Sequence, residues 1–198
     1  MFVLAPLAVR EGSGRSVLVD LGWTALCLAG VAALSKRRAV KAALFVLVVA
    51  ATAVRWGPFS VQATVAASLL SVAAMTFVVF GQAFRAGPVN LHRIKGAVAA
   101  YLLLGLTWAL AYELVALLAA GAFAGTGLGG SERPDFIYFS FVTLTTVGYG
   151  DVTPIHPVAR SLAVTEALTG QLYPAILLAR LVSLATDSAP VGPEKPTS

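Results

Sequence analysis

Long apolar segments with few or no charged side chains are the feature that most constrains this chain. Residues 59–84 contain no Asp, Glu, Lys or Arg, and the segments 17–34, 40–56, 96–123 and 157–186 contain only isolated ones. A backbone surrounded by hydrocarbon must satisfy its own hydrogen bonds, as a helix does. About 20 helical residues cross the roughly 30 Å hydrocarbon core of a bilayer. With 58% hydrophobic residues in a chain of 198, these segments predict an all-α integral membrane protein with five transmembrane helices.

The two ends of the chain fall outside the predicted transmembrane helices. Residues 1–16 are too short to cross a bilayer and are interrupted by Pro6, so we predict a tail. Residues 187–198 are polar and contain prolines, which predicts a disordered tail. An alternative is that residues 17–34 are a cleaved signal peptide. That alternative would place the basic loop at 35–39 outside the cell, against the positive-inside rule.

The stretch between the last two apolar segments has a different pattern. After the glycine-rich residues 125–130, which predict a flexible loop, residues 134–145 are apolar and hydroxyl-bearing but too few to cross a bilayer. Proline and aspartate at their start suit the first turn of a helix. The next residues are Thr146-Val147-Gly148-Tyr149-Gly150-Asp151. Glycine tolerates positive φ, so the two glycines let successive backbone carbonyls turn toward one side, where they can replace the water around a cation.

Residues 146–150, followed by Asp151, resemble without substitution the selectivity filter of the tetrameric potassium channel family, which selects K⁺ through rings of backbone carbonyls. The stretch 138–145 is also similar to the family's pore helix. The resemblance implies a homotetramer with a central pore, because one chain supplies one filter strand and four are needed around an axis. It implies a pore domain over 91–186, made of an outer helix at 96–123, a re-entrant pore helix at 134–145, a filter at 146–150 and an inner helix at 157–186.

The same resemblance assigns roles to individual residues. The backbone of Thr146, Val147, Gly148 and Tyr149 would bind K⁺, with Gly150 completing the filter and the Thr146 hydroxyl joining the innermost site. Three side chains would support the filter from behind: Asp151 through a hydrogen bond, and Tyr138 and Phe139 by bracing Tyr149. Independently of the resemblance, the position of Glu166 inside a predicted membrane helix suggests a fourth support through a hydrogen bond to the pore helix.

Residues in the predicted inner helix suggest a flexible point and a cavity. Pro174 cannot donate a hydrogen bond to the carbonyl of Gly170, so a bend should centre on this turn. Gln171, Pro174 and Leu178 share a helical face that would line the cavity below the filter. The alternatives are that Gly170 and Pro174 have no role in gating and that Gln171 forms a hydrogen bond between helices.

Apart from Asp20 near the start of the first predicted helix, two carboxyl side chains lie within predicted membrane helices, where a charge is costly to bury. Glu113 lies in 96–123 and Glu166 in 157–186. For Glu166, the functional interpretation is a proton acceptor that makes the filter sensitive to pH. The structural interpretation is a hydrogen bond between helices, with the acid protonated. The single cysteine, Cys27, excludes a disulfide within the chain.

Basic residues gather in two breaks between the apolar segments, at 35–39 and 85–95, each with three Lys or Arg residues. A filter that faces outward, as the resemblance implies, places both breaks in the cytoplasm, in agreement with the positive-inside rule. Five helices then put the N-terminus outside and the C-terminus inside a multi-pass protein of the cell (plasma) membrane. Membrane topology therefore explains the net charge of +5, and we predict no nucleic-acid partner.

The predicted function is passive, potassium-selective permeation through a tetrameric filter. Permeation makes and breaks no chemical bond, so we predict no enzymatic activity and no cofactor, with K⁺ as the permeant ion. The expected partners are three further copies of the chain and the lipid bilayer. The helices within 17–90 lack an arginine at every third position, which argues against voltage sensing. The alternatives are a non-conducting membrane scaffold or accessory channel subunit, and a transporter, which would need four such loops in one chain.

Overall fold

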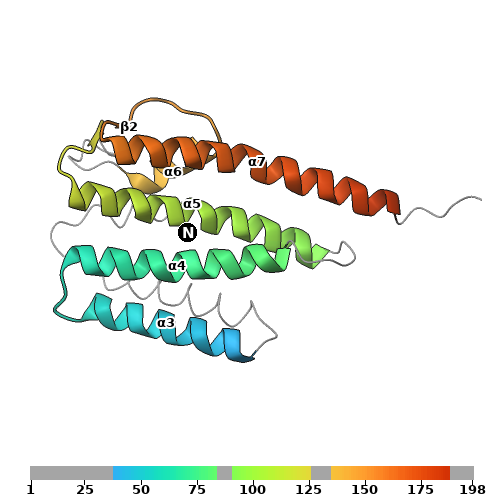
Figure 1. Ribbon diagram of the computed structural model, residues 1–198, viewed down its shortest axis with the longest axis horizontal. Coiled ribbons are helices and arrows are strands. Elements are labelled where there is room, and N and C mark those ends of the chain that lie inside the picture. The colour runs from blue at the N-terminus through green and yellow to red at the C-terminus, as the bar shows by residue number, and fades with distance from the viewer. Residues whose placement is uncertain (1–37, 84–90, 126–134, 188–198) are drawn as a thin grey trace, which may run out of the picture.

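The computed structural model describes residues 38–83, 91–125 and 135–187 (Figure 1). The first predicted helix, the two tails, Pro134 and most of the glycine-rich loop lie outside these ranges. The described residues form five helices and a two-stranded ribbon. Their bounds are α3 Arg38–Trp56, α4 Val61–Ala83, α5 Leu91–Leu118, β1 Phe123–Ala124, α6 Phe136–Leu144, β2 Thr153–Pro154 and α7 Pro157–Asp187.

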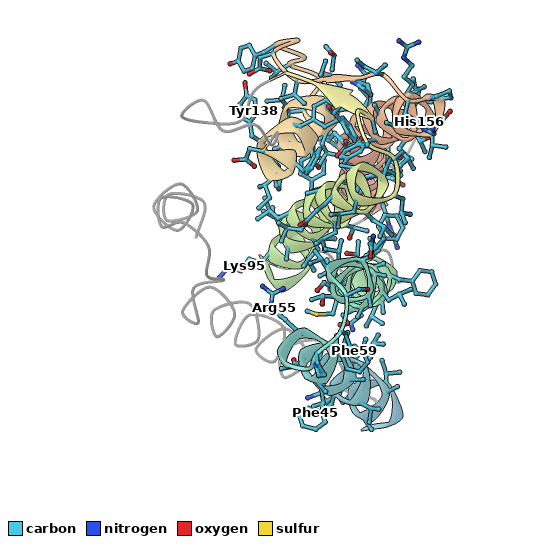
Figure 2. All side chains as sticks on the ribbon, turned by 90° about the vertical axis from the view of Figure 1, so that its left-hand side faces the viewer. Phe45, Arg55, Phe59, Lys95, Tyr138 and His156 are labelled. Atoms are coloured by element: carbon cyan, nitrogen blue, oxygen red, sulfur yellow. The ribbon has the colours of Figure 1, made fainter. Side chains whose placement is uncertain are left out.

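The helices lie side by side in the order α3, α4, α5 and α7, and the short α6 is held between α5 and α7 (Figure 1). Figure 2 views this arrangement along the helices. Phe45 and Phe59 lie at its α3 side, and Tyr138 and His156 lie at its α6 and α7 side. The polypeptide thus places its short helix and its loop on the opposite side of the layer from α3.

Three of the described helices are long and apolar enough to cross a membrane. The stretches are Val61–Gln82 in α4, Ile94–Leu118 in α5 and Pro157–Arg180 in α7. They coincide with the third, fourth and fifth predicted transmembrane helices. The second predicted helix corresponds to α3, and the total of five transmembrane helices stays a prediction.

Apolar side chains join α4 to α3, and hydroxyl side chains join it to α5. Leu44 and Val48 of α3 pack against Met75 of α4. On the other side of α4, the Thr76 hydroxyl lies 3.0 Å from the Thr107 hydroxyl of α5. Short hydroxyl side chains allow close approach of helices in a membrane and provide hydrogen bonds between them. Such contacts explain why a helix without charged residues packs firmly on two others.

The ends of two helices differ from their predicted positions. The predicted outer helix at 96–123 is α5, which begins at Leu91 and ends at Leu118. It ends early because Gly121 adopts a positive φ of 73° and the next residues pair with β2. The predicted pore helix at 134–145 is α6, which is nine residues long. It starts after Asp135, whose Oδ1 caps the helix by accepting hydrogen bonds from the amides of Ile137 (3.0 Å) and Tyr138 (3.1 Å).

The last helix begins at Pro157 as predicted and continues through Pro174 to Asp187. Proline suits the first turn of a helix because the missing N–H has no partner there. At Pro174 the missing N–H removes one hydrogen bond from the helix interior. The helix nevertheless continues for more than three further turns.

Candidate functional site

Two glycines let α6 pack closely between α5 and α7. A Cβ atom at Gly105 of α5 would lie 2.7 Å from the ring of Phe141. A Cβ atom at Gly170 of α7 would lie 2.8 Å from the carbonyl carbon of Leu144, and its oxygen would be closer still. Gly170 was predicted as a hinge, and the hinge stays a prediction. The structure gives the residue another role, which is to admit the backbone at the C-terminal end of α6.

The backbone after α6 turns back on the helix and then alternates in handedness. The amides of Val147 and Gly148 donate to the carbonyl of Val142, at 3.0 and 3.3 Å. Thr146, Gly148 and Gly150 have positive φ values of 61°, 59° and 78°, whereas Val147 and Tyr149 between them do not. Sequence reasoning identified the two glycines but missed Thr146, because a β-branched residue rarely adopts this conformation. We refer to residues 146–151 as the filter loop.

The carbonyl oxygens of residues 146–150 accept no hydrogen bond from any described residue. The amides at the start of the loop, by contrast, donate hydrogen bonds to α6, at the carbonyl of Val142. The loop is also exposed in the single chain, with Val147 52% and Tyr149 71% accessible. Five consecutive carbonyl oxygens are therefore not used within the described chain and are free to bind a ligand from outside it.

One aromatic side chain of α6 lies against the filter loop. The rings of Tyr138 and Tyr149 are parallel, with an interplanar angle of 1° and centroids 6.4 Å apart. The Tyr138 hydroxyl donates to Oδ2 of Asp151 at 2.7 Å, and the other carboxylate oxygen accepts from the amide of Val152 at 3.0 Å. The hydrogen bond to Asp151 is the main cause that raises the pKa of Tyr138 to about 12. Tyr138 therefore remains a donor at neutral pH.

Phe139 packs in the core of the chain, and its bracing of Tyr149 stays a prediction. It is buried, and its ring centroid is 4.9 Å from that of Tyr112 and 5.7 Å from that of Phe123. Adjacent helical residues point about 100° apart, so Phe139 faces α5 when Tyr138 faces the loop. It anchors the back of α6 in the core.

Glu166 joins all three helices of this region. It is fully buried on α7, and its Oε2 accepts from the Tyr112 hydroxyl of α5 at 2.5 Å. Its Oε1 lies 2.5 Å from the Ser140 hydroxyl of α6. The predicted contact of Glu166 with the pore helix is thus present in the structure. Tyr112 and Ser140 were not singled out from the sequence, although a buried carboxyl in a membrane helix must have polar partners.

Two further tyrosines link α5 to its neighbours, Tyr101 to the C-terminal end of α6 and Tyr173 to α7. The Tyr101 hydroxyl donates to the carbonyl of Leu144 at 3.1 Å, and the Tyr173 hydroxyl donates to the carbonyl of Ala97 at 2.7 Å. Their rings pack with centroids 5.5 Å apart. Sequence reasoning missed both. The available signal was that a tyrosine in an apolar segment needs a partner for its hydroxyl.

A short ribbon ties the exit of the filter loop to the end of α5. Phe123 pairs with Pro154 and Ala124 with Thr153 in antiparallel orientation. The amides of Ile155 and His156 both donate to the carbonyl of Ala122, at 2.8 and 3.1 Å. The loop is therefore held at α6 on one side and at α5 on the other.

The predicted cavity residues lie on an exposed part of α7. Gln171 and Pro174 are exposed, and Leu178 is 63% accessible. A row of large apolar side chains on the helix is exposed as well, comprising Val164, Leu168, Leu172 and Ile176. The buried face of α7, with Glu166, Gly170 and Tyr173, is directed toward α5 and α6.

Residues 97–187 match the family model described as an ion channel. These residues, the ion-channel segment, include most of α5, all of α6, the filter loop and α7. Together with the three apolar helices, the match indicates a membrane protein that carries an ion-channel segment.

Known proteins with similar sequences each match less than half of the chain. Protein LctB of Bacillus caldotenax is 52% identical over 48 residues, which are 24% of this chain and 35% of that protein. Two pore potassium channel c of Oryza sativa subsp. japonica is 41% identical over 64 residues, which are 31% of this chain and 14% of that protein. Inward rectifier potassium channel Kirbac3.1 of Paramagnetospirillum magnetotacticum is 40% identical over 85 residues, which are 43% of this chain and 26% of that protein. Each match thus spans about a third or less of the relative. No solved structure matches the chain.

Proposed function

We propose that four copies of this chain form a potassium-selective channel, in which the filter loops surround one axis and K⁺ passes along their backbone carbonyls. The observation that carries the proposal is the row of five carbonyl oxygens without a donor, on a backbone that alternates in handedness at Thr146, Gly148 and Gly150. Rings of such oxygens can replace the hydration shell of an ion. The ion-channel match, and the printed names of two relatives as potassium channels, support the choice of ion.

The C-terminal end of α6 adds an electrostatic reason for a cation. The end of a helix carries a partial negative charge, and α6 ends at Leu144, directly before the filter loop. We assign K⁺ binding to Thr146, Val147, Gly148 and Tyr149, with Gly150 completing the loop and Asp151 supporting it through Tyr138. Passage of the ion requires no chemical step, so the protein is not an enzyme in this proposal.

The surfaces of α5 and α7 support an assembly of several copies. Within the chain, 44% of the membrane-spanning stretch of α4 is buried, against 17% each for those of α5 and α7. The exposed face of α7 carries the row of large apolar side chains Val164, Leu168, Leu172 and Ile176, which suits contact with other copies of the chain. In a four-fold ring this face meets neighbouring copies, and Gln171, Pro174 and Leu178 line the cavity.

Helices α3 and α4 form a peripheral scaffold in this proposal. Large apolar side chains of α3 and α4 point away from the rest of the chain, including Phe45 (51% accessible) and Phe77 (80%), as lipid-facing residues do. Neither helix carries the regular arginines that a voltage sensor needs. The first turns of α3 and α5, with Lys41 and Lys95, lie at the end of the layer opposite the ribbon (Figure 1), so we place that end in the cytoplasm of a plasma-membrane protein.

Rubidium flux into liposomes that contain the purified protein tests the proposal, with sodium flux as the measure of selectivity. We expect rubidium to enter and sodium to be excluded. Gly148→Ala should abolish the rubidium flux or its selectivity over sodium, because alanine is strained at the positive φ of that residue. The matched control is Gly81→Ala, where an added Cβ meets nothing within 4 Å. A folded tetramer without rubidium flux would favour the alternative, a non-conducting scaffold or accessory subunit.

A further inference from the structure

Ser140 lies between two oxygen atoms that both require a proton from it. Its Oγ is 2.7 Å from the carbonyl oxygen of Gly105 and 2.5 Å from Oε1 of Glu166. A serine hydroxyl carries one proton and donates to one acceptor, while its oxygen can accept from another donor. The carbonyl of Gly105 can only accept. Both short contacts are therefore hydrogen bonds only when the second proton belongs to Glu166.

We propose that the Glu166 carboxyl carries a proton in this arrangement and is a positioning residue that fixes α6 between α5 and α7. The Tyr112 hydroxyl donates to Oε2 of Glu166. The protonated Oε1 donates to Ser140, and Ser140 donates to the carbonyl of Gly105. Every proton in this chain of bonds has one acceptor, which is the condition for a buried polar network to stabilise a structure.

The groups around the carboxyl are consistent with a neutral acid. On α5 the titratable groups that face Glu166 are Tyr112 and Tyr101, and on α6 the facing group is Ser140. The ribbon strand packed against α7 consists of Thr153 and Pro154. Among the described residues, no Lys, Arg or His is hydrogen-bonded to Glu166 or paired with it. A buried carboxylate without a cation is costly, whereas a neutral carboxyl with satisfied hydrogen bonds is not.

Loss of this proton breaks the link between α6 and α5. A carboxylate only accepts, so the single proton of Ser140 must serve either Glu166 or Gly105. If Ser140 turns to Glu166, its bond to Gly105 is lost, and if it does not, two bare oxygens remain in contact. Either way α6 is held less firmly, six residues before the filter loop begins. The consequence for ion passage rests on the proposed channel function, whereas the position of the proton does not.

Infrared spectroscopy of the protein in liposomes locates the proton without any measurement of flux. At neutral pH, we expect the carbonyl stretch of a protonated carboxylic acid, with the small shift in D₂O that such a group shows. Glu166→Gln should remove this band. The control is Glu113→Gln, which removes the carboxyl next to Tyr112 on α5. This variant should keep the band. A spectrum without the band, or a band that Glu166→Gln does not remove, would overturn the assignment.

The pH dependence of rubidium flux then tests the positioning role. Glutamine reproduces the neutral acid, since its amide donates to Ser140 and its oxygen accepts from Tyr112. We expect the flux of the unmodified protein to fall as the pH rises above neutral toward about 8–9, the range documented for buried glutamates, and that of Glu166→Gln to stay constant. Equal pH profiles for the two proteins would refute the positioning role. If the infrared band is present but neither protein conducts, the channel function fails and the proton assignment stands.

Discussion

Replacement of Gly170 by alanine should displace the end of the pore helix and lower selectivity. The new Cβ would lie 2.8 Å from the carbonyl carbon of Leu144 and closer to its oxygen, whereas carbon atoms are normally about 3.5–4.0 Å apart. The obstacle is backbone, so no side-chain rotation relieves it. Overpacking of this kind costs about 1–3 kcal/mol, and alanine recovers about 1 kcal/mol of helix propensity. The net expectation is a loss of up to roughly 2 kcal/mol in folding stability.

The assay is thermal unfolding of the tetramer together with rubidium and sodium fluxes. Gly96→Ala is the matched control, because that glycine is also helical and an added Cβ meets nothing within 4 Å. It should gain stability by up to about 1 kcal/mol and keep its selectivity. A pure hinge at Gly170 would change how often the channel opens but not which ion passes. A Gly170→Ala protein with unchanged stability and unchanged selectivity would refute the close-packing argument.

Three further predictions concern contacts of the same chain. Tyr138→Phe should loosen Asp151 and lower the heat stability that K⁺ confers. In the unmodified protein, this hydrogen bond should persist at neutral pH and weaken only as the pH rises from about 10 toward the Tyr138 pKa of about 12. Thr76→Val should remove the bond to Thr107 and destabilise the protein by about 0.6–1.7 kcal/mol in a denaturation series. A loss of ion selectivity in this variant would contradict a purely structural role for the bond. Asp135→Ala should remove the cap of α6 at a cost of about 1 kcal/mol while Asp135→Asn retains it, and equal melting curves for the two would refute the cap.

The elements that were predicted correctly depend on local patterns. Apolar segments long enough to cross a bilayer define helices by their length and composition, and three of them appear as α4, α5 and α7. The presence of a short helix before the filter loop also followed from local sequence, although it starts at Phe136 after the cap Asp135 and not at residue 134. Local chemistry of this kind requires no knowledge of how distant segments pack.

The contacts that were missed join residues far apart in sequence. Tyr112 and Glu166 are separated by 54 positions, so no local pattern indicates that they meet. The contact of Glu166 with the pore helix was predicted, but Ser140, 26 positions away, was not identified as the residue that makes it. The early end of α5 has the same cause, since it depends on two residues that pair with a strand beyond the filter loop. Helical geometry alone directs Phe139 and Tyr138 to different sides of α6, and the bracing of Tyr149 by Phe139 stays a prediction.

The contacts of α6 explain why a loop can leave its carbonyls unpaired and still keep one shape. The polar bonds of this region lie on the α6 and ribbon sides of the loop: Tyr138 to Asp151, Tyr101 to Leu144 and Val147 to Val142. The backbone is thus fixed through its amides and flanking side chains, and its carbonyls are not needed for folding. It follows that changes at Gly170, Tyr112 or Glu166, none of which offers an oxygen to the ion, should alter selectivity by moving α6. Substitutions in α3 that cost the same stability should leave selectivity unchanged, because α3 lies on the opposite side of the layer from α6 and the loop (Figure 1).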